Sequence, residues 1–247
     1  MTRTLTLLHD PADPELDLVV MPFGGGGPTA FLPWTRRIRP SWRLSAVCLP
    51  GRGARFTEPF HTDAQAAAQE VAAAIRSSRL RSSPRPLVLF GHSLGALLAR
   101  DVAALVPAEL LCVAGCSPPT DRGRSGFEAE PEHVVREFTR SLGLADPGML
   151  EEVVTLTTPV FRADLALYDG YRAPATPLAC DVVAYYGDRD DVPAQAWSRH
   201  TTGRAAVVRL PGDHYFVQRA PGPLVADLER RAGRVPPLHH REVKARP

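Results

Sequence analysis

The 247-residue sequence contains almost no lysine, and its charges nearly cancel. Lys244 is the single lysine among 29 basic residues, and the formal net charge at pH 7 is only +2. A strong positive excess and basic runs interleaved with aromatic residues would indicate nucleic-acid binding, and the sequence has neither. We therefore expect no nucleic-acid partner.

Long hydrophobic runs are also missing. No uninterrupted apolar run reaches the roughly 18 residues that a membrane-spanning helix needs. Residues 1–13 lack the charged start, the apolar core and the small-residue cleavage site of a signal peptide. These absences predict a cytoplasmic protein that does not associate with a membrane.

Cysteine is scarce and shows no metal-binding pattern. Only Cys112 and Cys116 lie close together in the sequence, and no matching histidine or cysteine pair follows them. A reducing compartment keeps thiols free, and the four cysteines lie in apolar segments. We expect four buried free thiols, no metal site and no cofactor.

Short apolar runs alternate with helical patterns along the chain. Strand-like segments lie at residues 5–9, 18–22, 44–49, 86–90, 110–114, 182–186 and 205–210. Helical patterns lie at residues 62–77, 94–105, 131–142, 147–168, 194–202 and 224–232. Continuous apolar strands that alternate with helices predict an α/β fold, with a mostly parallel sheet covered by helices on both faces.

The most informative motif is Gly91-His92-Ser93-Leu94-Gly95, which lies between a strand-like run and a helical run. It matches the G-x-S-x-G nucleophile elbow, a sharp strand-to-helix turn that exposes a serine in a strained backbone conformation. A buried structural serine in a β–α turn is the alternative. The flanking strand and helix favour an activated Ser93 on a central strand.

An activated serine needs a histidine base, and that base needs an orienting carboxylate. In α/β-hydrolases these residues follow in the order serine, acid, histidine. His214 lies after the last strand-like run and is the predicted base. Asp190, three residues past the glycine that ends the preceding strand, is the predicted acid, with Asp188 as second choice. Asp191 is placed to cap the following helix.

The oxyanion formed by attack of Ser93 needs two backbone N–H donors. One is expected from Leu94, the residue after the nucleophile, and the other from the loop after an earlier strand. That loop is the glycine-rich segment 22–27. A phosphate-binding loop is the alternative reading of these glycines, but no Gly-Lys-Ser/Thr follows, and we predict an oxyanion loop.

Residues 121–172 interrupt the alternation with helical patterns and no clear strand. An insertion at this point would lie over the carboxyl ends of the strands, where open α/β sheets bind ligands, and we predict a helical lid. Residues 1–120 and 173–233 would form the α/β-hydrolase core. Residues 234–247 show no periodicity and are expected to form a flexible tail.

Several further motifs combine with the elbow into a family pattern. They are Pro50-Gly51-Arg52, Phe161-Arg162-Ala163-Asp164, Gly187-Asp188-Arg189-Asp190 and His214-Tyr215-Phe216. With them the chain, over about residues 18–228, resembles the type II thioesterases, the discrete editing hydrolases that accompany polyketide and nonribosomal peptide synthetases. The Pro-Gly-Arg segment and the Arg-Ala-Asp of the predicted lid distinguish this group from other esterases.

The resemblance implies catalytic roles for Ser93, Asp190 and His214 and oxyanion donors at the backbone N–H groups of Gly24 and Leu94. The sequence departs from the family pattern at two places. The usual His-Ala-Gly-Gly is Phe23-Gly24-Gly25-Gly26 here, and the usual Gly-Gly-His is Gly212-Asp213-His214. We therefore expect a pocket of altered shape and polarity, with an extra carboxylate beside the base.

The implied partner is an acyl or peptidyl carrier protein that bears an acyl thioester on its phosphopantetheine arm. His214 would deprotonate Ser93, the carrier thiol would leave, and a water molecule would hydrolyse the acyl-serine ester. The alternative is a chain-releasing thioesterase or a small-ester hydrolase on the same fold. A non-catalytic interaction module is the third possibility, and the serine, acid and histidine in hydrolase order argue against it.

Overall fold

Seven strands form one sheet in the order β1-β3-β2-β4-β5-β6-β7, with β4 in the centre. Apart from β1, which pairs antiparallel with β3, all neighbouring strands are parallel. The strands are β1 (Leu5–His9), β2 (Leu16–Met21), β3 (Trp42–Val47), β4 (Leu87–His92), β5 (Leu110–Ala114), β6 (Asp181–Gly187) and β7 (Ala205–Leu210). The predicted mostly parallel sheet is confirmed, and so is the central position of the strand that precedes Ser93.

The computed structural model describes residues 3–79, 85–118, 130–141, 143, 146–172, 174–190, 192 and 194–234. Its α-helices are α1 (Ala64–Arg79), α2 (Leu94–Leu105), α3 (Pro131–Ser141), α4 (Pro147–Gly170), α5 (Phe216–Arg219) and α6 (Pro221–Ala232). Three 3₁₀ segments accompany them, η1 (Pro28–Arg36), η2 (Gly53–Arg55) and η3 (Ala194–His200). The helix expected at residues 194–202 is thus a short 3₁₀ segment with Trp197 buried. The proposed cap Asp191 and residues 235–247 of the predicted tail 234–247 lie outside the described residues.

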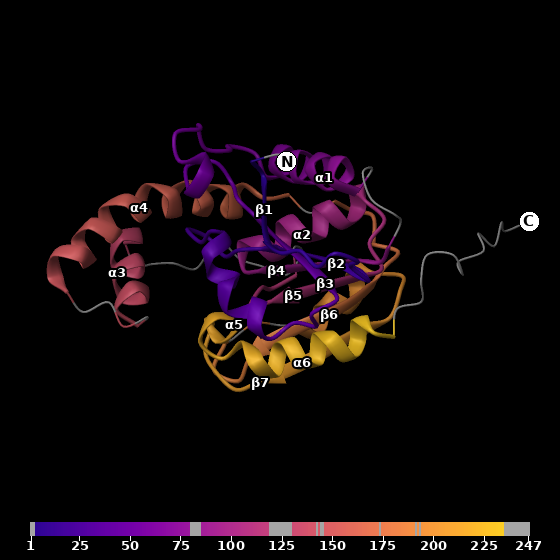
Figure 1. Ribbon diagram of the computed structural model, residues 1–247. Coiled ribbons are helices and arrows are strands. Elements are labelled where there is room, and N and C mark those ends of the chain that lie inside the picture. Colours follow the sequence, from indigo (N-terminus) through magenta and orange to yellow (C-terminus); the bar gives the residue numbers. More distant parts are fainter. Residues whose placement is uncertain are drawn as a thin grey trace, which may run out of the picture.

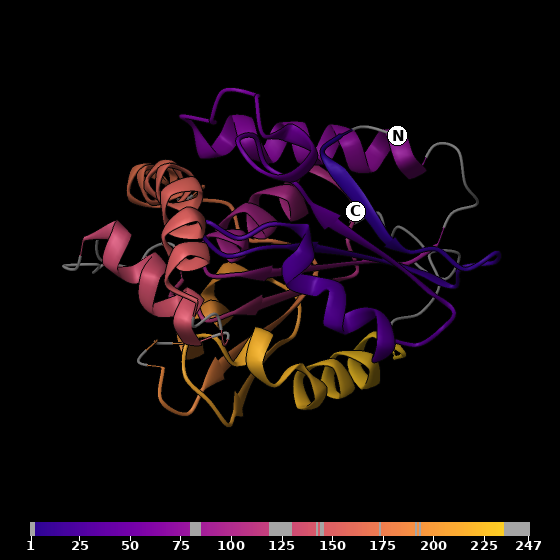
Figure 2. The same ribbon diagram turned by 60° about the vertical axis from the view of Figure 1, so that its left-hand side comes forward.

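Helices cover both faces of the sheet, with α1 and α2 above the strands and α6 below them in Figures 1 and 2, and each face carries its own hydrophobic cluster. In β4, Leu87 and Leu89 pack on the layer that contains α1 and α2. Val88 and Phe90 pack on the opposite layer, which contains η1 and α6. Because successive side chains of a strand point to opposite faces, a strand covered on both sides is apolar throughout. This explains the continuous apolar run before the motif.

Helices α3 and α4 pack against each other and project beyond the sheet, at the left of Figure 1. Buried Val135, Leu150 and Val154 form their interface, and Arg136 pairs with Glu132 and Glu151 on its rim. The far end of α4 returns over α2. The helical content predicted for the insertion is present, and the division into core 1–120 and 173–233 and lid 121–172 stays a prediction.

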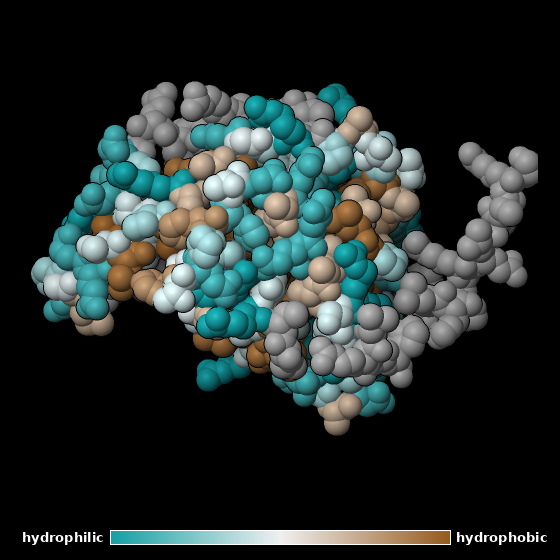
Figure 3. Space-filling view, turned by 90° about the horizontal axis from the view of Figure 1, so that it is seen from above, coloured by the Kyte–Doolittle hydropathy of each residue, from teal (hydrophilic) through white to brown (hydrophobic). Residues whose placement is uncertain are grey.

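The molecular surface seen from above in Figure 3 is mainly hydrophilic, with hydrophobic residues in small groups. Large exposed apolar side chains include Phe56, Met149 and Leu156, which belong to different parts of the chain or to different turns of α4. Scattered apolar residues are normal on a surface in contact with water. None of the helices in the described ranges combines the length and the apolar character needed to cross a bilayer.

Two glycines allow the close packing of β4, α2 and β2 at the motif. A Cβ on Gly91 would lie 2.6 Å from Ala96 Cα and overlap the Gly95 carbonyl oxygen. A Cβ on Gly95 would lie 2.5 Å from the Pro22 carbonyl oxygen and overlap that of Met21. These neighbours are backbone atoms of the sheet and helix, and they cannot rotate away as a side chain could.

We predict that Gly95→Ala lowers the free energy of unfolding by about 3 kcal/mol or more, because overpacking against fixed backbone forces the elements apart. Gly222→Ala on α6 is the matched control, since its Cβ would meet nothing within 4 Å. We expect the control to be neutral or slightly stabilising. Urea unfolding of both variants measures the difference, and equal midpoints would contradict the packing argument.

Candidate active site

Ser93 occupies the turn between the central strand β4 and helix α2. Its φ of 55° and ψ of −120° make it the one non-glycine residue with positive φ in the described part of the chain. Its N–H donates to the Ala114 carbonyl at 2.9 Å, which ties the turn to the end of β5. This is the strained strand-to-helix turn that the G-x-S-x-G pattern predicts.

His214 and Asp190 meet at the same edge of the sheet. The loops after β6 and β7 carry them, and His214 Nδ1 donates to Asp190 Oδ2 at 3.2 Å. Asp190 is mostly buried, with 11% of its side chain exposed, so its hydrogen bond with His214 is largely shielded from water. With Nδ1 engaged by the carboxylate, Nε2 is the nitrogen left for exchange with a nucleophile.

His214 and Ser93 line one small cavity together with Gly24 and Leu94. Within the described residues, no hydrogen bond joins Ser93 Oγ to His214. Hydrogen bonds of this kind are often long in the absence of substrate and tighten when it binds. The structure therefore brings the predicted nucleophile and base to one cavity in a loose arrangement.

Asp188, the second candidate for the acid, does not approach the base. Its side chain is exposed, and Oδ1 accepts from the Gly212 N–H at 2.9 Å. Its own N–H donates to the Leu210 carbonyl at 2.8 Å. Asp188 thus ties together the loops after β6 and β7, while Asp190 faces the histidine.

His92 is fully buried beside His214 and supports it through the backbone. Its Nε2 donates to the His214 carbonyl at 2.9 Å, and its Nδ1 accepts from Gln218 Nε2 at 3.2 Å. Burial, reinforced by nearby His214, holds the pKa of His92 well below its usual value. His92 is therefore a neutral imidazole that fixes the loop carrying the base, and no sequence pattern indicated this contact.

Asp213, the extra carboxylate next to the base, is already paired. Its Oδ1 accepts from the Tyr215 N–H at 3.0 Å, and Oδ2 pairs with Arg219. The negative charge that distinguishes this loop from the usual Gly-Gly-His is thus neutralised by a neighbouring arginine on α5.

Two backbone N–H groups are available near Ser93. Leu94 is the first residue of α2, and the first N–H groups of a helix have no partner within it and attract negative charge. In the glycine-rich loop, the Gly25 N–H donates to Asp164 and the Gly26 N–H to the Phe23 carbonyl. Among the described residues, the Gly24 N–H has no such acceptor. Both predicted donor positions line the Ser93 cavity.

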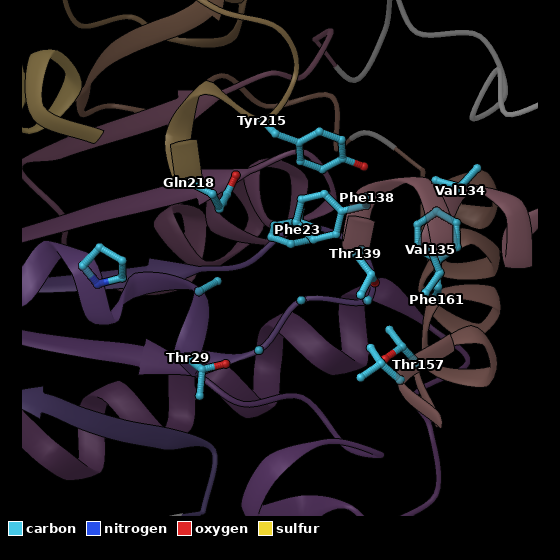
Figure 4. Close-up of a pocket in the computed structure, with 17 residues that line it drawn as sticks. Phe23, Thr29, Val134, Val135, Phe138, Thr139, Thr157, Phe161, Tyr215 and Gln218 are labelled. Carbon is cyan, nitrogen blue, oxygen red and sulfur yellow. The ribbon is translucent and has the colours of Figure 1, made fainter. Parts of the chain in front are cut away.

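The Ser93 cavity measures only about 20 Å³, which is room for about one water molecule. A second cavity of about 400 Å³ lies beside it, between the glycine-rich loop, η1 and helices α3 and α4. Phe23, Phe161 and Tyr215 line both cavities and form the wall between them. Figure 4 shows Phe23 in the middle of the larger cavity's lining.

Phe23 is held in this wall by aromatic neighbours. Its ring lies edge-on to those of His92, Phe138 and Tyr215, with centroid distances of 5.5, 5.1 and 5.7 Å. Phe138 comes from α3, so Phe23 packs directly against one of the two helices of the predicted lid. The family's usual histidine at this position is replaced here by an apolar ring, which lines both cavities.

The four cysteines are free and buried, as predicted, and none of them lines the Ser93 cavity. Burial raises the pKa of the Cys112 thiol, so it stays protonated and unreactive. In the part of the chain that the structure describes, no group of three or more histidine, cysteine, aspartate or glutamate residues is arranged to hold a metal ion.

A strained serine at the carboxyl edge of a mostly parallel sheet, with a histidine and carboxylate in later loops, characterises the α/β-hydrolases, and this chain has that fold. The model of the thioesterase domain matches residues 17–231. The chain therefore belongs to the thioesterase family and is an enzyme that hydrolyses thioesters.

Solved structures and relatives agree with this assignment. The chain is similar to RedJ, a thioesterase from the prodiginine pathway of Streptomyces coelicolor, at 33% identity and a TM-score of 0.76, covering 90% of this chain and 88% of that one. The chain is also similar to BorB, the type II thioesterase of the borrelidin cluster, at 26% identity and a TM-score of 0.77, covering 92% of this chain and 97% of that one. The medium-chain S-acyl fatty acid synthase thioesterase of Rattus norvegicus is 26% identical, covering 88% of this chain and 87% of its own. The resemblance to type II thioesterases is confirmed.

We predict that Asp190→Asn lowers kcat for p-nitrophenyl acetate by about 10⁴-fold, because an amide does not hold the His214 tautomer that accepts the serine proton. Asp188→Asn is the matched control and is expected to stay within threefold of the wild type. Steady-state hydrolysis of the ester by both variants is the measurement. The opposite order of effects would assign the acid to Asp188.

Proposed function

We propose that this chain is an editing thioesterase that removes acyl groups from the phosphopantetheine arm of carrier proteins. The observation that carries the proposal is the single cavity shared by Ser93, His214, Gly24 and Leu94, with His214 Nδ1 bound to Asp190. A nucleophile, a base and two N–H donors around one point are the groups that acyl transfer requires.

In the proposed reaction, His214 Nε2 takes the proton of Ser93 while Oγ attacks the thioester carbonyl. The N–H groups of Gly24 and Leu94 stabilise the negative oxygen, and the carrier thiolate leaves with the proton from His214. A water molecule deprotonated by the same histidine then hydrolyses the acyl-Ser93 ester. Asp190 stabilises the imidazolium in both halves of the reaction.

The carrier protein is the proposed partner because of the kinds of protein that the chain resembles. RedJ and BorB belong to biosynthetic pathways by their titles, and BorB is described as a type II thioesterase. Short acyl groups are the proposed substrates, because the space at Ser93 is small and Phe23 separates it from the larger cavity.

Release of longer chains is the second candidate function. The cavity of about 400 Å³ favours it, since its lining is mainly apolar and would accept an alkyl chain that passed Phe23. The similarity to a medium-chain fatty acid synthase thioesterase supports the same possibility. The two functions differ in the acyl length that is hydrolysed fastest.

The testing experiment compares acetyl-, propionyl- and octanoyl-carrier protein with p-nitrophenyl acetate, using wild type, Ser93→Ala and Ser198→Ala. Ser198 is an exposed serine on η3 and serves as the matched control. We expect short acyl-carriers to be hydrolysed fastest by wild type and control, and Ser93→Ala to lose at least about 1,000-fold.

Preference for octanoyl-carrier would favour chain release over editing. Rapid ester hydrolysis with untouched carriers would indicate a small-ester hydrolase. Undiminished hydrolysis by Ser93→Ala would remove the serine from the mechanism.

The position of Phe23 between the two cavities predicts that replacing it changes the acyl-chain length that is hydrolysed fastest. Phe23→Leu removes part of the ring that separates the two cavities, and we expect kcat/KM for octanoyl-carrier to rise about tenfold relative to propionyl-carrier. Val153→Ala, which enlarges the larger cavity away from Ser93, is the control and should leave the ratio within twofold. An equal shift in both variants would show that cavity size, and not the wall, sets the preference.

A further inference from the structure

Asp164 on α4 joins the lid helices to the glycine-rich loop. Its side chain is 2% exposed, and Oδ2 accepts from the Gly25 N–H at 2.7 Å and from Arg52 Nη1 at 2.6 Å. Oδ1 accepts from Arg52 Nη2 at 2.7 Å. The carboxylate thus forms a two-pronged ion pair with one residue and a backbone hydrogen bond with another.

Arg52 holds the same loop from its other side. Its Nη1 also donates to the Gly26 carbonyl at 2.9 Å, and its side chain is 8% exposed. The loop is therefore bound at two successive residues, through the N–H of Gly25 and through the C=O of Gly26. Three segments distant in sequence, the loop, the Pro-Gly-Arg segment and α4, meet at one buried ion pair.

The bound residues adjoin the proposed oxyanion donor. Gly24 immediately precedes Gly25, whose φ is +79°, and a Cβ at Gly25 would lie 3.3 Å from Phe161. The four consecutive glycines 24–27 have wide conformational freedom, and a fixed donor direction needs an external restraint. The hydrogen bond from Gly25 to Asp164 sets the peptide plane next to Gly24 and supplies that restraint.

Stability alone does not account for this pair. Burying two charges costs solvation that their attraction and hydrogen bonds must recover, and apolar pairs are often at least as stabilising. What a two-pronged arginine–carboxylate pair provides is defined geometry, because the planar guanidinium matches both carboxylate oxygens. Lysine retains the charge of arginine but cannot reproduce this match.

We propose that Asp164 and Arg52 are positioning residues that orient the Gly24 N–H toward the oxyanion, so that the oxyanion site is complete only when α4 is seated on the core. The proposal rests on the proposed function, since it takes Gly24 as a donor in the reaction of Ser93. Neither residue takes part in proton transfer or in the attack of Ser93 on the carbonyl carbon.

The test compares Arg52→Lys with Arg55→Lys. Arg55 is the matched control, because it is a similarly buried arginine in an ion pair with Glu58 and Glu70, and it lies three residues away without touching the glycine-rich loop. Asp164→Asn is the second variant. The measurements are kcat and KM for p-nitrophenyl acetate, inhibition by phenylboronic acid, which forms a negatively charged tetrahedral adduct on serine, and the thermal midpoint.

We expect Arg52→Lys and Asp164→Asn to lower kcat by about 100-fold and to weaken boronic acid inhibition in parallel, with KM changed less than threefold. Arg55→Lys should keep kcat and inhibition within threefold. A loss of thermal stability with unchanged kcat and inhibition in the folded protein would overturn the proposal. So would failure of both variants to fold while Arg55→Lys folds, because the pair would then be a structural element.

The ester substrate keeps this test separate from the proposed function. Both esters and thioesters pass through an oxyanion, so the comparison holds if the wild type hydrolyses p-nitrophenyl acetate but no acyl-carrier protein. That result would refute the proposed editing function, and the ester kinetics would still test the positioning role. Normal hydrolysis of acyl-carriers by Asp164→Asn would reject the positioning role and leave the function intact.

Discussion

The contact between Gly95 and the carbonyl oxygens at the end of β2 constrains the whole active edge of the molecule. Neither Gly95 nor Gly91 has room for a Cβ, so β4, α2 and β2 approach as closely as backbone allows. That approach forces the positive φ of Ser93 and aims the first N–H groups of α2 at the space beside its hydroxyl. Every other group of the site is placed relative to this turn.

Parallel strands supply the remaining groups because their carboxyl ends share one edge. The loops after β2, β6 and β7 contribute the glycines, Asp190 and His214, and helix α4 lines the same cavity. The supporting contacts come from elsewhere in the chain: His92 and Gln218 fix the backbone of His214. A site built from rigid strand ends and braced loops keeps its donors in place before the substrate arrives.

Arg52 and Arg55 are both buried and both form ion pairs, but they connect different parts of the molecule. Burial disfavours the charge of Arg55, yet its hydrogen bonds with Glu70 and Glu58 raise its pKa. Burial also disfavours the charge of Glu70, but its hydrogen bonds with Arg55 and Thr4 lower its pKa. This cluster braces the segment before α1. Arg52 instead forms an ion pair with Asp164 of α4 and donates a hydrogen bond to the Gly26 carbonyl of the glycine-rich loop. The Pro-Gly-Arg and Arg-Ala-Asp motifs that occur together in the sequence are thus two halves of one contact.

The sequence by itself determined the class of fold, the strained turn at Ser93 and the chain order of acid and base. These depend on local regularities, namely apolar runs, helical periodicity and the small residues that a sharp turn requires. The sequence favoured Asp190 over Asp188 as the acid, and the tertiary structure places Asp190, not Asp188, beside His214. Only the tertiary structure made residues 194–200 a 3₁₀ segment and put Phe23 in the lining of both the Ser93 cavity and the larger cavity. It also joined Arg52 to Asp164 across 112 positions. Such contacts leave no periodic signal, because they depend on how distant segments pack in three dimensions.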